Sequence, residues 1–156
     1  MQKFRNIIIT LVITFNMLII TACGTINVSG KTFRFKDVHI DWGVADSENK
    51  QSIYEEYQVK DEKELIEVLK TRDGRNSRFT TFGTNDKYTT KNSNNEIIDE
   101  GYYKQDETVI TLADTIEGLS QVGAYTLHAN DKGYIVTIKL NDQWKVFAKY
   151  QYVEQE

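Results

Sequence analysis

The sequence predicts a mainly β domain, an antiparallel meander that closes into a barrel and carries one short helix. Short runs of aromatic and β-branched residues alternate with polar turn clusters from Arg78 onward, which is typical of consecutive antiparallel strands. Residues 61–74 have helical periodicity instead. Because closure removes exposed strand edges, about eight or nine such strands favour a barrel. An open α+β sheet with the helix on one face is the alternative.

The first element is an apolar segment, Ile7 to Ile20, that follows the basic residues Lys3 and Arg5. A positive start followed by a short apolar run is typical of a signal peptide. As a helix the segment would cover about 21 Å, against about 30 Å for the hydrocarbon core of a bilayer. It is therefore too short to span a membrane comfortably.

The segment ends in Ile20-Thr21-Ala22-Cys23, and Cys23 is the only cysteine of the chain. This tetrapeptide resembles the lipobox of bacterial lipoproteins, which has an aliphatic residue at −3, a small residue at −1 and cysteine at +1. The resemblance implies cleavage between Ala22 and Cys23 and a diacylglyceryl group on the Cys23 sulfur. Two acyl chains are enough to hold a protein stably on a membrane.

The sequence therefore predicts three segments, which are a signal peptide over residues 1–22, a lipidated tether over 23–30 and a barrel domain over 31–156. The expected location is the extracytoplasmic face of the cell membrane, and the Lys-, Asn- and Ile-rich composition without proline suggests a Gram-positive bacterium. An ordinary secretory signal with an unrelated cysteine and an uncleaved N-terminal anchor are the alternatives.

The charge and the cysteine content of the chain argue against nucleic-acid binding, anionic-membrane binding and disulfide bonding. The whole chain has a formal net charge of −4, and removal of Lys3 and Arg5 makes the remainder more acidic. Such a domain is a poor candidate for binding nucleic acid or an anionic membrane surface. With Cys23 lipidated, no intrachain disulfide is possible.

The first strand, within residues 31–42, has apolar residues on two alternating sets of positions. Phe33 and Phe35 share one parity, whereas Val38, Ile40 and Trp42 share the other. A regular strand cannot place both sets on one face. The pattern therefore predicts a bulge or bend near Lys36-Asp37 that restores a common apolar face.

The helix follows a loop over residues 43–52 and a possible strand at Ile53–Val59. Asp61 can cap its first turn, with Glu64 three residues later as in a capping box, and Gly74 can end it. The apolar face of the helix comprises Leu65, Val68 and Leu69. The remaining strands are predicted around residues 78–83, 87–90, 97–104, 108–112, 121–129, 133–140 and 144–153.

Residues 79–114 carry a second resemblance, to the small lipocalin-like (calycin) domains of bacterial lipoproteins. The matching segments are Phe82-Gly83, Tyr88-Thr89-Thr90, Gly101-Tyr102-Tyr103 and Val109-Ile110-Thr111-Leu112. In those domains a strand ending in Phe-Gly precedes a Tyr/Thr strand, a Gly-x-Tyr strand and an aliphatic strand. The resemblance implies a lipocalin-like β-barrel.

No arrangement of residues points to catalysis, so no enzyme, cofactor or metal site is expected. His39 and His128 occupy strand positions that face solvent in the predicted pattern, and their separation gives no local zinc motif. The acidic pairs are adjacent in sequence and would point to opposite faces of a strand. No glycine-rich phosphate loop occurs.

Aromatic residues that alternate with polar ones are the remaining candidates for function. An eight-stranded barrel either fills its interior with such side chains or holds one small ligand. The first hypothesis is a small apolar or amphipathic ligand in a cavity, and the second is a protein-interaction module of the cell envelope, such as an immunity, exclusion or assembly factor, with a packed core. The candidate ligand-binding residues are Phe33, Phe35, Trp42, Phe82, Tyr103 and Trp144.

Overall fold

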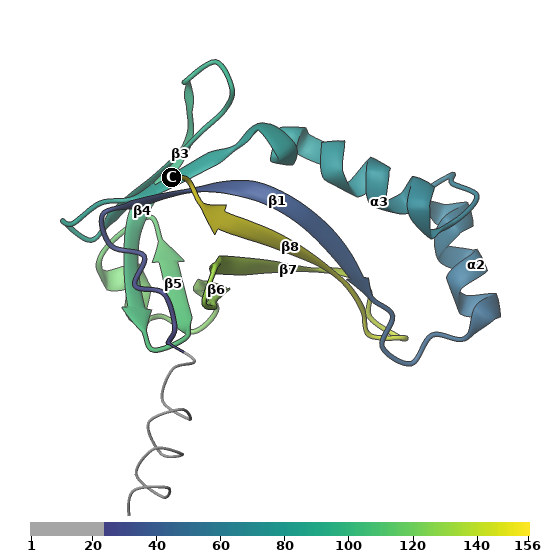
Figure 1. Cartoon of the computed structure of the whole chain (residues 1–156). Helices are drawn as coiled ribbons and strands as arrows, with labels where there is room; N and C mark the ends of the chain where they lie inside the picture. The colour runs from purple at the N-terminus through teal and green to yellow at the C-terminus, as the bar shows by residue number, and fades with distance from the viewer. Residues whose placement is uncertain (1–23) are drawn as a thin grey trace, which may run out of the picture.

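A computed structural model describes residues 24–156, and within this range the chain forms a closed antiparallel barrel of eight strands (Figure 1). Each strand pairs with the next along the chain, and β8 pairs back with β1. The predicted meander barrel is therefore confirmed. The strands are β1 (Lys31–Asp41), β2 (Phe79–Phe82), β3 (Lys87–Lys91), β4 (Ile97–Asp106), β5 (Val109–Ala113), β6 (Tyr125–Ala129), β7 (Gly133–Asn141) and β8 (Val146–Glu154).

The predicted bulge in the first strand is present. The pairing of β1 with β8 shifts register between Phe35, opposite Tyr152, and Asp37, opposite Gln151. Lys36 is thus the extra residue, and the side chains of Phe33 and Val38 are both buried on either side of it. One additional residue in the strand lets two alternating apolar sets share one face.

Two α-helices lie between β1 and β2, where one helix was predicted. They are α2 (Ser47–Glu56) and α3 (Glu62–Thr71), and the 3-10 segments are η1 (Arg72–Ser77) and η2 (Glu117–Ser120). The predicted strand at Ile53–Val59 is wrong, because residues 47–56 are helical. The cause is local: the Asp46 carboxylate accepts from the Asn49 backbone N–H, and the Asn49 side chain accepts from the Asp46 N–H.

The predicted helix after Asp61 is confirmed. The Asp61 carboxylate accepts from the Glu64 backbone N–H at 2.9 Å, while the Glu64 carboxylate reaches back to the Lys60 N–H at 2.9 Å. Leu65 is fully buried, as is Leu69, whereas Val68 is 39% exposed. After α3 the backbone turns sharply, with φ of 55° at Asp73 and 64° at Gly74.

The barrel extends into a helix-covered sheet on one side. Residues 31–34 of β1 pair with β2, and Phe33 and Arg34 pair with β8 as well, whereas beyond the bulge β1 pairs with β8 alone. Likewise β7 pairs with β6 only near its start and with β8 along its length. The long ends of β1, β8 and β7 form a three-stranded sheet, and α2 and α3 arch over it (Figure 1).

The N-terminal strap, residues 26–28, closes the end of the barrel at which β4 ends and β7 begins. The Ile26 N–H donates to the Asn130 carbonyl at 3.0 Å, and Val28, whose side chain is fully buried, donates its N–H to Gln105 at 3.0 Å. Gln105 in turn donates to the Ile26 carbonyl. We call this closed end the base and the opposite end the mouth. Among residues 24–156 no helix has the length and apolar character needed to cross a bilayer.

Leu65→Ala is expected to lower the free energy of unfolding by about 2–5 kcal/mol, because it leaves a cavity between α3 and the sheet. The matched control on the same helix is Val68→Ala, which is expected to change it by about 0.5 kcal/mol or less because Val68 is partly exposed. Urea unfolding followed by circular dichroism measures both. Equal losses in the two variants would contradict the packing of α3 described above.

Candidate functional site

A cavity of about 160 Å³ opens at the mouth of the barrel. Its polar lining comes from the segment after α3 and from the barrel strands, and its apolar floor comes from the strands alone. The polar side chains are Arg75, Arg78, Thr80, Thr90, Asp99, Tyr125, Tyr134 and Tyr152. The apolar ones are Ile98, Leu112, Leu127 and Val136. A small site with an apolar floor and a few polar groups is the usual form of a ligand-binding pocket.

Arg75 and Arg78 reach the mouth because η1 folds back from the end of α3. The left-handed conformations of Asp73 and Gly74 reverse the chain there, and Gly74 adopts such a conformation without steric cost. Arg78 donates to the Asp73 carbonyl, which fixes the turn against the start of β2. The two arginines therefore come to the edge of the barrel as part of one turn.

Both guanidinium groups have a buried donor that is unused. The Nε atoms of Arg75 and Arg78 are buried and donate to no acceptor among residues 24–156. One terminal nitrogen of Arg75 lies 3.8 Å from the Asp73 carboxylate, and the Arg75 guanidinium also lies over the Tyr150 ring at 5.1 Å. Since most buried polar atoms in folded proteins are hydrogen-bonded, two orphaned donors beside one cavity call for an explanation.

Tyrosines form the wall below the arginines. The rings of Tyr134 and Tyr152 are stacked, with centroids 4.9 Å apart and planes at 7°. Burial raises the pKa of Tyr134 far above its usual range, and the neighbouring Thr80 hydroxyl opposes this rise. Burial also raises the pKa of Tyr152, against the opposing charges of Arg75 and Arg78. Both phenols are therefore neutral near pH 7 and can donate hydrogen bonds.

The acidic residue of the lining, Asp99, already has a partner. Its carboxylate accepts from the Tyr88 hydroxyl at 3.2 Å. Burial is the main cause, and the Asp99 charge the second, that raises the pKa of Tyr88 to about 12. On the neighbouring strands the hydroxyls of Thr80 and Thr90 pair with each other at 3.1 Å and are buried. Asp99, Thr80 and Thr90 thus have hydrogen-bond partners, whereas the Nε atoms of the two arginines have none among residues 24–156.

The six aromatic residues proposed from the sequence lie outside this cavity. Phe33, Phe82 and Tyr103 come together near the base, where Phe82 is 5.8 Å from Phe33 and 4.9 Å from Tyr103, centroid to centroid. All three are buried, and the Tyr103 hydroxyl donates to the Gly83 carbonyl at 2.7 Å. These side chains form the packed part of the barrel core.

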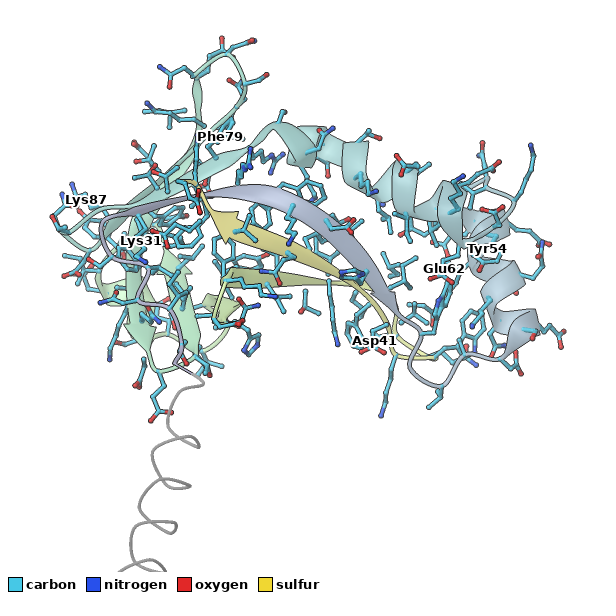
Figure 2. All side chains as sticks on the ribbon, viewed as in Figure 1. Lys31, Asp41, Tyr54, Glu62, Phe79 and Lys87 are labelled. Atoms are coloured by element: carbon cyan, nitrogen blue, oxygen red, sulfur yellow. The ribbon has the colours of Figure 1, made fainter. Side chains whose placement is uncertain are left out.

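The other three are separate from that group. Phe35 contacts the rings of Tyr150 and Tyr152. Trp42 lies under the corner between α2 and α3, with its ring 5.7 Å from Tyr54 and its indole N–H donating to Glu62 at 3.2 Å. Figure 2 shows Tyr54 and Glu62 at this corner, near the end of β1 marked by Asp41. Trp144 packs partly buried against the core, and a ligand role for any of the six remains a prediction.

The arginines were missed because their signal in the sequence is weak. They stand three residues apart just after Gly74, in a connection that looks like an ordinary helix-to-strand turn. Tyr134 and Tyr152 lie in predicted strands, and an inward position could have been assigned from strand alternation. His39 and His128 are exposed, and residues 24–156 contain no cluster of three or more potential metal ligands.

A broader depression of about 690 Å³ lies outside the barrel, along β1 and the C-terminal end of β8. Its lining is mostly charged and includes Arg34, Lys36, Lys132 and Glu154, with Phe35 as the aromatic member. Lysine and glutamate there are normal for a solvated surface. The smaller cavity at the mouth is the better candidate site because it combines an apolar floor with buried, unused donors.

Comparison with known protein families, with curated proteins and with solved structures finds no match for this chain.

Stability at alkaline pH tests the environment of Tyr88. Its folded pKa lies above the unfolded value near 10, so the folded state holds the proton more tightly and the free energy of unfolding falls as pH rises from 10 to 12. Tyr88→Phe is expected to make this fall smaller, as measured by urea unfolding at several pH values. Asp99→Asn should reduce it less, because burial is the larger cause. An unchanged pH dependence in Tyr88→Phe would contradict this assignment.

Proposed function

We propose that the barrel binds a small amphipathic ligand in the cavity at its mouth, and that the chain is a lipoprotein anchored through Cys23 to the extracytoplasmic face of the cell membrane. The observation that carries the ligand proposal is that the interior is packed near the base and hollow at the mouth. A barrel evolved only for stability would gain from filling that space.

The cavity suits the apolar part of a small molecule. Leu112, Leu127 and Val136 form a nearly dry floor, since each is less than 10% exposed. The volume of about 160 Å³ suits a small molecule. A larger ligand would extend past Ile98 and Tyr125, which are 44% and 51% exposed at the rim.

Anchoring through Cys23 is a separate part of the proposal, because residues 1–23, including the signal peptide and the Ala22-Cys23 cleavage site, lie outside the described residues. It is supported by the lipobox-like sequence and by the position of residues 26–28 on the barrel. Ile26 and Val28 pack at the base, opposite the mouth. An anchor at Cys23 would therefore leave the mouth open to the aqueous phase.

A protein-interaction role is the second candidate. The side chains of Ile97, Ile98, Val122 and Tyr125 are 44–106% exposed, and two of them line the mouth. Ile98 and Tyr125 thus lie together at the mouth, and exposed apolar patches are typical of interaction sites. This role would leave the cavity without a bound small molecule.

Filling the cavity tests the ligand proposal. The full chain is purified from its membranes in a mild detergent and examined by native mass spectrometry, with denaturing spectra for comparison. An extra mass that disappears on denaturation is expected for the wild type and should be lost in Leu112→Trp, whose side chain occupies the cavity. The control is Val44→Trp at an exposed site, which should keep the extra mass. A bare mass in the wild type would favour the interaction module.

The anchor has its own test in intact cells. Cys23→Ser is expected to move the chain out of the membrane fraction and to abolish incorporation of radiolabelled palmitate, because serine has no sulfur to alkylate. Fractionation and labelling measure the two effects. Retention of label in Cys23→Ser would overturn lipidation at this residue.

A further inference from the structure

We infer that the ligand carries a carboxylate, which Arg75 and Arg78 bind at the mouth of the barrel above a small apolar body. This inference rests on the proposed function and names the chemical class of its ligand. It starts from the two guanidinium groups that line the cavity and from the unused donor that each one buries.

The balance of charge at the mouth favours an anion. Two arginines and one carboxylate, Asp99, line the cavity, and Asp99 already accepts from Tyr88. Asp73 is the nearest acidic partner of Arg75, but the distance of 3.8 Å and the exposure of the Asp73 side chain make this a weak surface ion pair. The positive charge of the mouth is therefore only partly compensated.

The geometry of the donors favours a planar anion. A guanidinium group presents its Nε–H and a terminal N–H as a fork, which matches the two oxygens of a carboxylate. In both arginines the Nε is buried without an acceptor, and a terminal nitrogen of Arg78 already donates to the Asp73 carbonyl. A carboxylate in the cavity therefore reaches the two forks when the guanidinium groups turn toward it. The Tyr150 ring supports the face of the Arg75 guanidinium at 5.1 Å without using its donors.

The space beneath the arginines limits the rest of the ligand. The floor is made of Leu112, Leu127 and Val136, and stacked phenol rings form one wall. Such a surface favours a short alkyl chain or a single aromatic ring. The neutral phenols add hydrogen-bond donors, which an anion accepts and a cation does not. Benzoate combines a carboxylate with a single aromatic ring and serves as the probe.

The experiment uses the full chain, reconstituted in phosphatidylcholine nanodiscs, with empty nanodiscs as the blank. Isothermal titration compares benzoate with benzamide, a neutral molecule of the same shape, with benzylamine and with inorganic phosphate. Benzoate is expected to bind at least tenfold more tightly than benzamide, and benzylamine and phosphate should bind more weakly still.

The variants separate charge from geometry. Arg75→Gln combined with Arg78→Gln should lower benzoate affinity to that of benzamide while leaving benzamide affinity unchanged. The double variant Arg75→Lys with Arg78→Lys keeps the two charges but not the forked donors, so it should lose part of the preference for benzoate over benzamide. It also serves as the test if the Gln pair does not fold. The matched control is Arg34→Gln, an exposed arginine on β1 outside the cavity, which should change neither affinity more than twofold.

Three results would overturn the inference. Equal binding of benzoate and benzamide would remove the carboxylate preference while leaving the proposed ligand site intact. Phosphate binding as tight as benzoate binding would indicate an adventitious ion only. Absence of binding by all four probes would also reject the inference, and the proposed function would then stand or fall on the native mass of the wild type and Leu112→Trp.

Discussion

The pairing of β1 with β8 is the constraint on which the rest of this structure depends. At its start β1 also pairs with β2, so that its first residues close the barrel. Beyond the bulge at Lys36 it continues with β8 alone and packs against α3. One strand therefore belongs to two layers, and the bulge lets its apolar side chains face inward in both.

This arrangement also explains why the mouth is polar. The chain leaves β1 at the far end of the extended sheet, crosses back over it as α2 and α3, and must then enter β2 at the mouth of the barrel (Figure 1). The return is made by η1, whose left-handed residues turn the chain into β2. Arg75 and Arg78 lie at the barrel edge because the connection has to pass there. The helices thus position the site without contributing to its lining.

Local patterns of apolar and polar residues in the sequence predicted most of the fold. Alternation located the strands of the meander, and the change of parity between Phe35 and Val38 predicted the bulge. Ile53–Val59 was misread because its apolar spacing fits a strand as well as a short helix, and the deciding cap at Asp46 uses asparagine in place of the usual glutamate. The arginine pair could not be predicted in the same way. Its position depends on which part of the barrel the turn contacts, and no local sequence pattern encodes that contact.

The packing of the strap at the base has a consequence for how the protein would stand on a membrane. The sequence predicted a tether over residues 23–30, yet Ile26 is already hydrogen-bonded to Asn130. Two residues, Gly24 and Thr25, lie between Cys23 and Ile26, and the three residue steps from Cys23 to Ile26 span about 10 Å when the chain is fully extended. A lipid at Cys23 would therefore keep the base of the barrel within about 10 Å of the bilayer surface.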